Sequence, residues 1–312
     1  MKECRSILFV SHGTESEHEV ATLQQAIQLA HANQASLDIL IIGPPLTKAL
    51  EQYKAPFEAF LTGNINKTIE AAKSGLPASH TKRHMDIEID WEDAPSIKII
   101  QRIIHKSHDL LIKAAENDEN TKGFKALDMD LLSKCPCTLF LHRPFKHKKQ
   151  VHIAVAIDPD TRELARKELS VQLLQLTQHL AAYYKTPFGI ISCWDYLLEK
   201  FLRSSVWMEM PEEEIEQTIQ QENDTSYQAV TNLLKTAGIN SKAAIYHVKG
   251  DPTELIPEFI VKEGIDILVM GTVARTGISG FIIGNTAENI LQKVDCSLWA
   301  IKPRGFVSPV RG

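Results

Sequence analysis

The residues best suited to chemistry lie between Asp266 and Pro303. The apolar run Ile267–Met270 is too short for a helix and predicts a buried strand. A helix is predicted to begin at Asn285, because Glu288 three positions later completes a capping-box pattern. A strand, a glycine-rich loop and a helix N-terminus in this order can hold an anion on backbone N–H groups. The glycines of the intervening loop are Gly271, Gly277, Gly280 and Gly284.

This stretch resembles the universal stress protein family, whose ATP signature at this place is G-x2-G-x9-G-[ST]. Gly271 takes the first position of the signature, Ala274 the second, Gly284 the third and Asn285 the last. Two positions therefore depart from the pattern. Ala274 adds a Cβ where a glycine lets the backbone approach phosphate, and Asn285 replaces a hydroxyl with an amide. The resemblance implies the family, and it implies ATP binding only in part.

By this resemblance, ATP or another adenine nucleotide is the candidate ligand, although the sequence establishes no cofactor. It would lie at the carboxyl ends of the strands in the second half of the chain. Asp158 would contact the adenosine, Ile191 or Ser192 would offer backbone groups, and Arg275 would add charge-assisted contacts to the phosphates. The alternative is that Asp158 caps a helix and the glycines only turn the chain. The other candidate residues of the loop and helix start are Gly271, Thr272, Ala274, Gly277, Gly284, Asn285 and Thr286.

No catalytic residues are predicted. Neither half carries a GxxxxGK[ST] or GxSxG motif, or acid and histidine residues paired at neighbouring strand ends. No metal site is predicted either, because the Cys135-x-Cys137 spacing is shorter than the C-x2-C zinc pattern. Nor do the histidines have metal-ligand spacing, among them His142, His147, His152 and His179. We therefore expect a protein that is not an enzyme.

The bulk composition excludes several classes of protein. A length of 312 residues is typical of about two domains, and a net charge of -5 gives no reason to expect nucleic acid or an anionic membrane. No apolar stretch approaches the roughly 18 residues that span a bilayer, and the N-terminus lacks a signal-peptide core. Five scattered cysteines do not suggest a disulfide framework. We expect a reduced, cytoplasmic protein with neither membrane nor nucleic-acid partners.

The two halves of the chain repeat each other. We therefore expect a duplicated domain, with the first copy at residues 1–146 and the second at 147–312. The basic segment 143–150 is the expected linker between them. The matched segments are Asp109–Lys113 (DLLIK) with Asp266–Met270 (DILVM), and Cys137–Pro144 with Cys296–Pro303.

Strands alternate with helices in both copies, which predicts an α/β fold with two tandem, doubly wound, five-stranded parallel sheets. The family resemblance implies the same Rossmann-like, adenine nucleotide alpha-hydrolase-like domains. The last strand of each copy, Thr138–Leu141 and Leu298–Ile301, is expected to join the halves into an intrachain pseudo-dimer, because an unpaired edge strand invites pairing. The strands expected in the first copy are Ile7–Val10, Leu37–Ile42, His84–Trp91, Leu110–Ile112 and Thr138–Leu141.

The first copy has lost the nucleotide motif. Ser11 stands in the place of Asp158 and Ala114 in the place of Gly271. Its loop also contains acids that would repel phosphate: Glu116, Asp118 and Glu119. We expect this half to serve as a packing or dimerisation partner, or to hold a more apolar ligand.

The resemblance implies a tandem universal stress protein that supports stress resistance through regulatory interactions, as a homo-oligomer with unidentified protein partners. Three hypotheses remain open. The first is an interaction module without a small ligand, which Ala274 and Asn285 favour. The second is an ATP-binding regulator, with or without weak hydrolase activity, which Asp158 and the glycines favour. The third is a binder of an apolar or lipid-like molecule at the aromatic insertion 194–210, although such a segment is expected to pack over its own domain or the sister domain.

Overall fold

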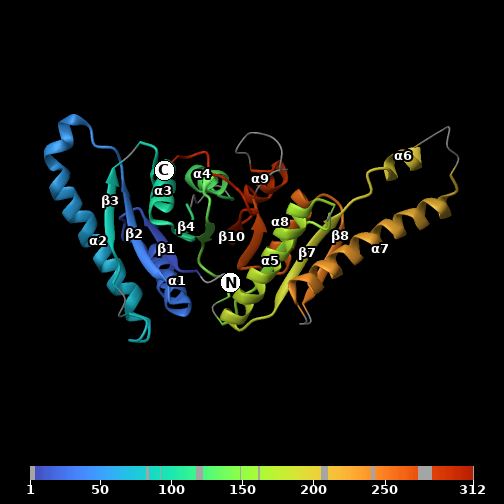
Figure 1. The fold of residues 1–312 in the computed structure, drawn as a ribbon, viewed down its shortest axis with the longest axis horizontal. Coiled ribbons are helices and arrows are strands. Elements are labelled where there is room, and N and C mark those ends of the chain that lie inside the picture. The colour runs from blue at the N-terminus through green and yellow to red at the C-terminus, as the bar shows by residue number, and fades with distance from the viewer. Residues whose placement is uncertain are drawn as a thin grey trace.

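The computed structural model describes residues 4–81, 84–91, 93–116, 122–147, 149–160, 162–204, 210–239, 243–272 and 283–311. Within these ranges the chain forms two α/β halves that share a ten-stranded sheet (Figure 1). The strand order is β3-β2-β1-β4-β5-β10-β9-β6-β7-β8. The predicted fold class is confirmed.

The first half contributes one side of this sheet and its covering helices. Its strands are β1 (Ser6–Ser11), β2 (Ser36–Gly43), β3 (Ile87–Trp91), β4 (Leu110–Ala114) and β5 (Thr138–His142). Its helices are α1 (Glu17–Asn33), the short 3-10 helix η1 (Lys48–Tyr53), α2 (Lys54–Ser74), α3 (Pro95–Lys106) and α4 (Ala126–Lys134).

The second half repeats the pattern. Its strands are β6 (Ile153–Ile157), β7 (Phe188–Trp194), β8 (Ala244–Lys249), β9 (Ile267–Gly271) and β10 (Ser297–Ile301). Its helices are α5 (Leu164–Tyr184), α6 (Glu199–Ser204), α7 (Glu212–Ala237), α8 (Pro252–Lys262) and α9 (Asn285–Leu291).

Helices cover both faces of the sheet, which explains why the strands read as continuous apolar runs. One core lies between the sheet and α1, α2, α5 and α7. A second core lies between the opposite face and α3, α4, α8 and α9. Alternate residues of one strand enter different cores, as Phe9 and Val10 of β1 do.

The halves meet where the sequence predicts, along β5 and β10. These strands pair antiparallel, with Trp299 opposite Phe140, whereas the pairings within each half are parallel. The two rings stack with centroids 4.7 Å apart. Beside them, the Ser297 hydroxyl donates to the Arg143 carbonyl at 2.9 Å and accepts from the Arg143 N–H at the same distance. The predicted pseudo-dimer contact is confirmed.

The aromatic insertion differs from the expected packing. Figure 1 shows α6 and the start of α7 projecting away from the sheet. Leu197, Leu198 and Phe201 are 86%, 55% and 45% exposed. Trp207 and Met208 lie outside the described residues. The described part of this segment therefore presents apolar side chains to solvent.

Candidate functional site

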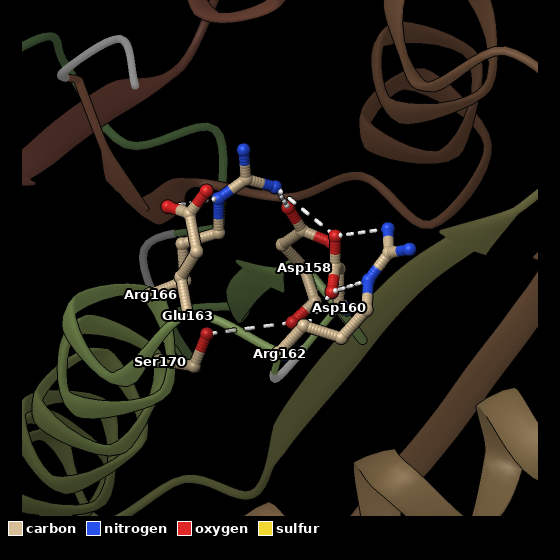
Figure 2. Close-up of polar contacts among 6 residues, drawn as sticks. All are labelled: Asp158, Asp160, Arg162, Glu163, Arg166 and Ser170. Carbon is tan, nitrogen blue, oxygen red and sulfur yellow. Dashed lines mark hydrogen bonds and ion pairs between the residues drawn. The ribbon is translucent and has the colours of Figure 1, made fainter. Parts of the chain in front are cut away.

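Asp158 directly follows β6, at the carboxyl edge of the sheet where the sequence places it. Figure 2 shows its carboxylate among the charged residues of the β6–α5 turn. Asp158 Oδ1 accepts from the Asp160 N–H at 2.9 Å, and Oδ2 lies 3.3 Å from Arg166 Nη1. Its side chain remains 55% exposed. Asp158 thus closes the turn but does not cap α5, whose N-cap is Glu163, and it still offers oxygen atoms to a ligand.

The same turn gathers further charge around Asp158. Arg162 donates to Asp160 through Nε and Nη2, both at 2.8 Å, and this bonding lowers the pKa of Asp160 to about 2. Arg166 also pairs with Asp160 at 3.4 Å and with Glu163 at 3.3 Å. Two guanidinium groups therefore stand beside the end of β6 (Figure 2).

Ile191 and Ser192 lie near the end of β7, the strand that pairs with β6. Ile191 is 1% exposed and packs in the core under α8. Ser192 is completely buried, and its neighbour in the β6 register is Ile157, the residue before Asp158. The Ser192 hydroxyl has no hydrogen-bond partner among the described residues. Buried polar groups without a hydrogen-bond partner are uncommon and call for an explanation.

Aromatic rings gather at the neighbouring strand end. His247 of β8 pairs with Ser192 in the sheet register. Its ring lies 6.1 Å from Trp194 and nearly parallel to it, and 5.6 Å from Tyr227 in an edge-on arrangement. Burial lowers the pKa of His247, so this ring is neutral at neutral pH. Sequence reasoning missed His247, because no motif marks it.

Gly271 and Thr272 contact protein groups. A Cβ on Gly271 would lie 2.7 Å from Leu169 Cδ2, so this glycine lets α5 pack against the strand end. Thr272 is fully buried, and its hydroxyl donates across the interface to the Leu132 carbonyl at 3.3 Å. Both residues thus have structural roles at the interface and under α5.

The remaining loop candidates divide into two groups. Ala274, Arg275 and Gly277 lie outside the described residues. Gly284 precedes α9 and is its N-cap, while Asn285 and Thr286 are exposed in the first turn of α9. The N-cap residue Gly284 has no side chain to cap α9, so the predicted capping box at Asn285 and Glu288 is wrong. The reason is that Asn285 is already helical, one position past the N-cap.

In the first half, protein charges fill the equivalent place. Lys113 occupies the position of Met270 in the repeat, and its Nζ donates to Asp128 Oδ1 and to the Ala114 carbonyl, both at 2.9 Å. Neither charged side chain is exposed. Glu116 Oε2 accepts from the Leu127 and Asp128 N–H groups at 3.0 and 3.4 Å and so caps α4. Lysine in the apolar run DLLIK was the sequence signal for this pair.

A cavity of about 480 Å³ lies between α5 and α7. Most of its lining side chains are polar, and none belongs to a strand end. They are Lys167, Asp224, Thr225, Gln228, Ala229, Asn232 and Leu233. None of these residues belongs to the insertion 194–210, where the sequence placed the apolar ligand. Among the described residues, no helix is long and apolar enough to cross a membrane.

The fold and the site define the class of protein. It is a duplicated Rossmann-like α/β chain with a partial nucleotide motif in its second half. A model described as the universal stress protein family matches residues 152–302. Universal stress protein E of Escherichia coli K12 is 30% identical over 241 residues, which cover 72% of this chain and 71% of that protein. The chain belongs to the universal stress protein family.

One further relative and two solved structures are similar to this chain. Universal stress protein E of Photorhabdus laumondii is 29% identical over 231 residues, covering 73% of this chain and 72% of that protein. A functionally unknown protein from Pseudomonas aeruginosa PAO1 has the same fold, with a TM-score of 0.69, 20% identity and coverage of 96% and 93%. A universal stress protein from Archaeoglobus fulgidus superposes with a TM-score of 0.63, 11% identity and coverage of 96% and 99%. The family name associates the chain with the stress response.

Proposed function

We propose that this chain supports stress resistance as a regulatory protein that binds one adenine nucleotide in its second half and does not turn it over. The nucleotide would lie at the carboxyl ends of β6, β7 and β9. The observation that carries this proposal is the completely buried Ser192 hydroxyl, which has no partner among the described residues. The cytoplasmic location and the homo-oligomeric state expected from sequence belong to the same proposal.

The orphan hydroxyl supports a ligand because leaving a buried polar group unpaired costs about 1–3 kcal/mol. A bound molecule with a donor or acceptor at this point would remove that cost. Asp158, at the end of the neighbouring strand, offers carboxylate oxygens to an amino or hydroxyl group of the ligand. A phosphate would compete with the carboxylates of this turn for the Arg162 and Arg166 guanidinium groups, which are already paired with them.

The contacts in the first half favour a single nucleotide site per chain, in the second half. In the first half, the Lys113–Asp128 pair and the Glu116 carboxylate already bond the groups whose equivalents in the second half would contact a phosphate. A nucleotide in the first half would have to displace a buried ion pair, which is strongly unfavourable. The proposal therefore assigns the two halves different roles: the first supports the shared sheet, and the second binds the ligand.

Binding without turnover is favoured by the chemistry at the site. Burial raises the pKa of Cys193 to about 11, so this cysteine near the end of β7 is a thiol rather than a nucleophilic thiolate at neutral pH. Weak hydrolysis, the sequence-based alternative, would require a group that orients water beside the phosphates.

The exposed apolar side chains around α6 favour a second candidate function. Leu197, Leu198 and Phe201 present apolar surface to solvent. An apolar or lipid-like molecule, or an apolar protein segment, would be held there. This function does not depend on the nucleotide.

Thermal unfolding with and without millimolar Mg-ATP tests the proposed nucleotide site. A ligand that binds only the folded chain stabilises it by about 2.7 kcal/mol at a hundred times its Kd, so Tm must rise. The rise should disappear in Gly284→Glu, shrink in Ser192→Ala and persist in Ser11→Ala, the matched strand-end change in the first half. An unchanged Tm, with no nucleotide co-purifying, would overturn nucleotide binding. A turnover assay on the same samples tests the regulatory role, and phosphate release that Gly284→Glu abolishes would contradict it.

A further inference from the structure

Two histidines stack at the amino edge of the sheet, on the side opposite the candidate nucleotide site. His147 lies in the segment between β5 and β6, and His152 directly precedes β6. Their ring centroids are 4.1 Å apart, with planes 15° from parallel. Asp266, directly before β9, lies beside them. We propose that His147 and His152 bind a divalent transition-metal ion such as Zn²⁺ through their Nε2 atoms, with Asp266 orienting the His147 ring.

The partners of the two rings fix which nitrogen carries hydrogen. His147 Nδ1 lies 3.0 Å from Asp266 Oδ2, and His152 Nδ1 lies 3.2 Å from the Glu263 carbonyl oxygen. The carboxylate already accepts the backbone N–H groups of Lys146 and His152, at 2.7 and 2.9 Å. Carboxylates and carbonyls only accept, so both Nδ1 atoms donate. In the neutral rings each Nε2 therefore keeps its lone pair, which is the form that binds metal.

The spacing of the ligand atoms suits one ion. One ligand atom from each of His147, His152 and Asp266 lies within 4.8 Å of the others. A tetrahedral Zn²⁺ with Zn–N bonds of about 2.0–2.1 Å holds two nitrogens roughly 3.3 Å apart, so the rings must turn from their nearly parallel stack to point both Nε2 lone pairs at one ion. The carboxylate–histidine–metal arrangement commonly fixes the orientation of a ligating imidazole.

The surroundings leave room for an ion. The His147 side chain is 40% exposed, so water can complete the coordination. Gly264 has a φ of +59°, and a Cβ there would lie 2.9 Å from His147 Cε1 and 3.4 Å from Nε2. The glycine thus keeps the space beside the proposed ligand atom open. The spacing of these histidines in sequence gives no metal pattern, and only the fold brings their rings together.

The first half shows that the histidines are not needed for folding this edge. Its equivalent carboxylate, Asp109, accepts the Arg5 and Ser6 N–H groups at 2.8 and 3.2 Å and the Cys4 thiol at 3.2 Å. The carboxylate therefore ties the chain before the first strand to the sheet in both halves. The stacked histidine pair is a feature of the second half. The role of Asp266 in tying the chain to the sheet does not explain this pair.

Calorimetric titration of the EDTA-treated chain with Zn²⁺ tests the site. The wild type and His179→Gln, a matched change of a histidine on α5 whose ring contacts the Gln175 carbonyl, should bind with the same affinity. His147→Gln and His152→Gln should each weaken binding at least 30-fold, with unfolding curves in EDTA that match the wild type. Co²⁺ in place of Zn²⁺ should give a spectrum without thiolate charge-transfer bands, because no cysteine is a ligand.

Three outcomes would overturn the metal site. These are no Zn²⁺ binding at all, equal binding by the wild type and both histidine variants, and thiolate bands with Co²⁺ that identify a cysteine site. None of them bears on the nucleotide proposal, whose variants change the opposite edge of the sheet. The two proposals can therefore fail separately.

Discussion

Lys113 Nζ lies 2.9 Å from Asp128 Oδ1, and both side chains are completely buried between β4 and α4. The Asp128 carboxylate also accepts the Glu116 N–H at 2.8 Å. Burial raises the pKa of Asp128, and the neighbouring ammonium opposes this shift. In the second half the position of Lys113 is taken by Met270. One copy of the domain thus closes its strand end with charge and the other with an apolar side chain.

The first prediction concerns this pair. Lys113→Met should lower the free energy of unfolding by about 3–5 kcal/mol, because it leaves Asp128 buried without its partner. The double variant Lys113→Met/Asp128→Leu should recover most of that loss, since an apolar pair of similar volume is tolerated there. Urea unfolding of the wild type, both single variants and the double variant measures the coupling. Losses that simply add in the double variant would show that the two groups do not interact.

The second prediction concerns the junction of the halves. Trp299 is 1% exposed and stacks on Phe140, so Trp299→Ala should cost about 3–5 kcal/mol by leaving a cavity. Trp299→Phe should cost much less, because it keeps the stack and removes an indole N–H that has no partner among the described residues. Calorimetry should show one transition for the wild type, as the halves share a sheet. Equal losses of stability in Trp299→Ala and Trp299→Phe would contradict a stabilising role of the ring stack.

Much of the fold follows from local sequence patterns. Buried parallel strands such as β1, β4 and β9 are short apolar runs with turns on both sides, and the repeat shows that both halves share one arrangement. The contact of β5 with β10 was also predictable, because each is the last strand of its copy and needs a partner.

The rest depends on tertiary contacts that no local pattern encodes. The stacking of His147 on His152 arises because the segment before β6 returns to the start of β9. Lys113 is buried because Asp128 of α4 meets it, whereas a lysine is usually predicted to be exposed. Gly271, a signature glycine by sequence, packs against Leu169. The contacts of Lys113 and Gly271 decide which side chains fill each strand end.

The third prediction concerns the ligand-free stability at the orphan hydroxyl. Ser192→Ala should leave the free energy of unfolding unchanged or raise it by up to about 1 kcal/mol, because the hydroxyl is buried without a partner among the described residues. Thr177→Ala is the matched control, since its buried hydroxyl donates to the Leu173 carbonyl at 2.7 Å. This change should destabilise the chain. A clear loss of stability in Ser192→Ala, measured by urea unfolding without nucleotide, would mean that the hydroxyl is already bonded.

The fourth prediction concerns pH and Lys302, which is 6% exposed at the interface of the halves. Its Nζ donates to the Leu132 carbonyl at the end of α4 and lies 4.9 Å from the Phe306 ring centre. Burial lowers the pKa of Lys302 from 10.5 to about 8. Between these values the unfolded chain binds more protons than the folded chain, so this lysine makes stability rise with pH.

The size of this effect follows from the shift in pKa. Each pKa unit corresponds to about 1.4 kcal/mol, so Lys302 should weaken the folded state by roughly 3 kcal/mol below pH 8 and by nothing above pH 10.5. Urea unfolding of the wild type and of Lys302→Met between pH 7 and 11 isolates this contribution. The wild type should gain stability relative to Lys302→Met as the pH rises through this window. The control variant Lys134→Met, which removes a partly exposed lysine and keeps Lys302, should gain stability as the wild type does. A constant difference between wild type and Lys302→Met across the window would mean that the buried ammonium is fully compensated by its carbonyl partners.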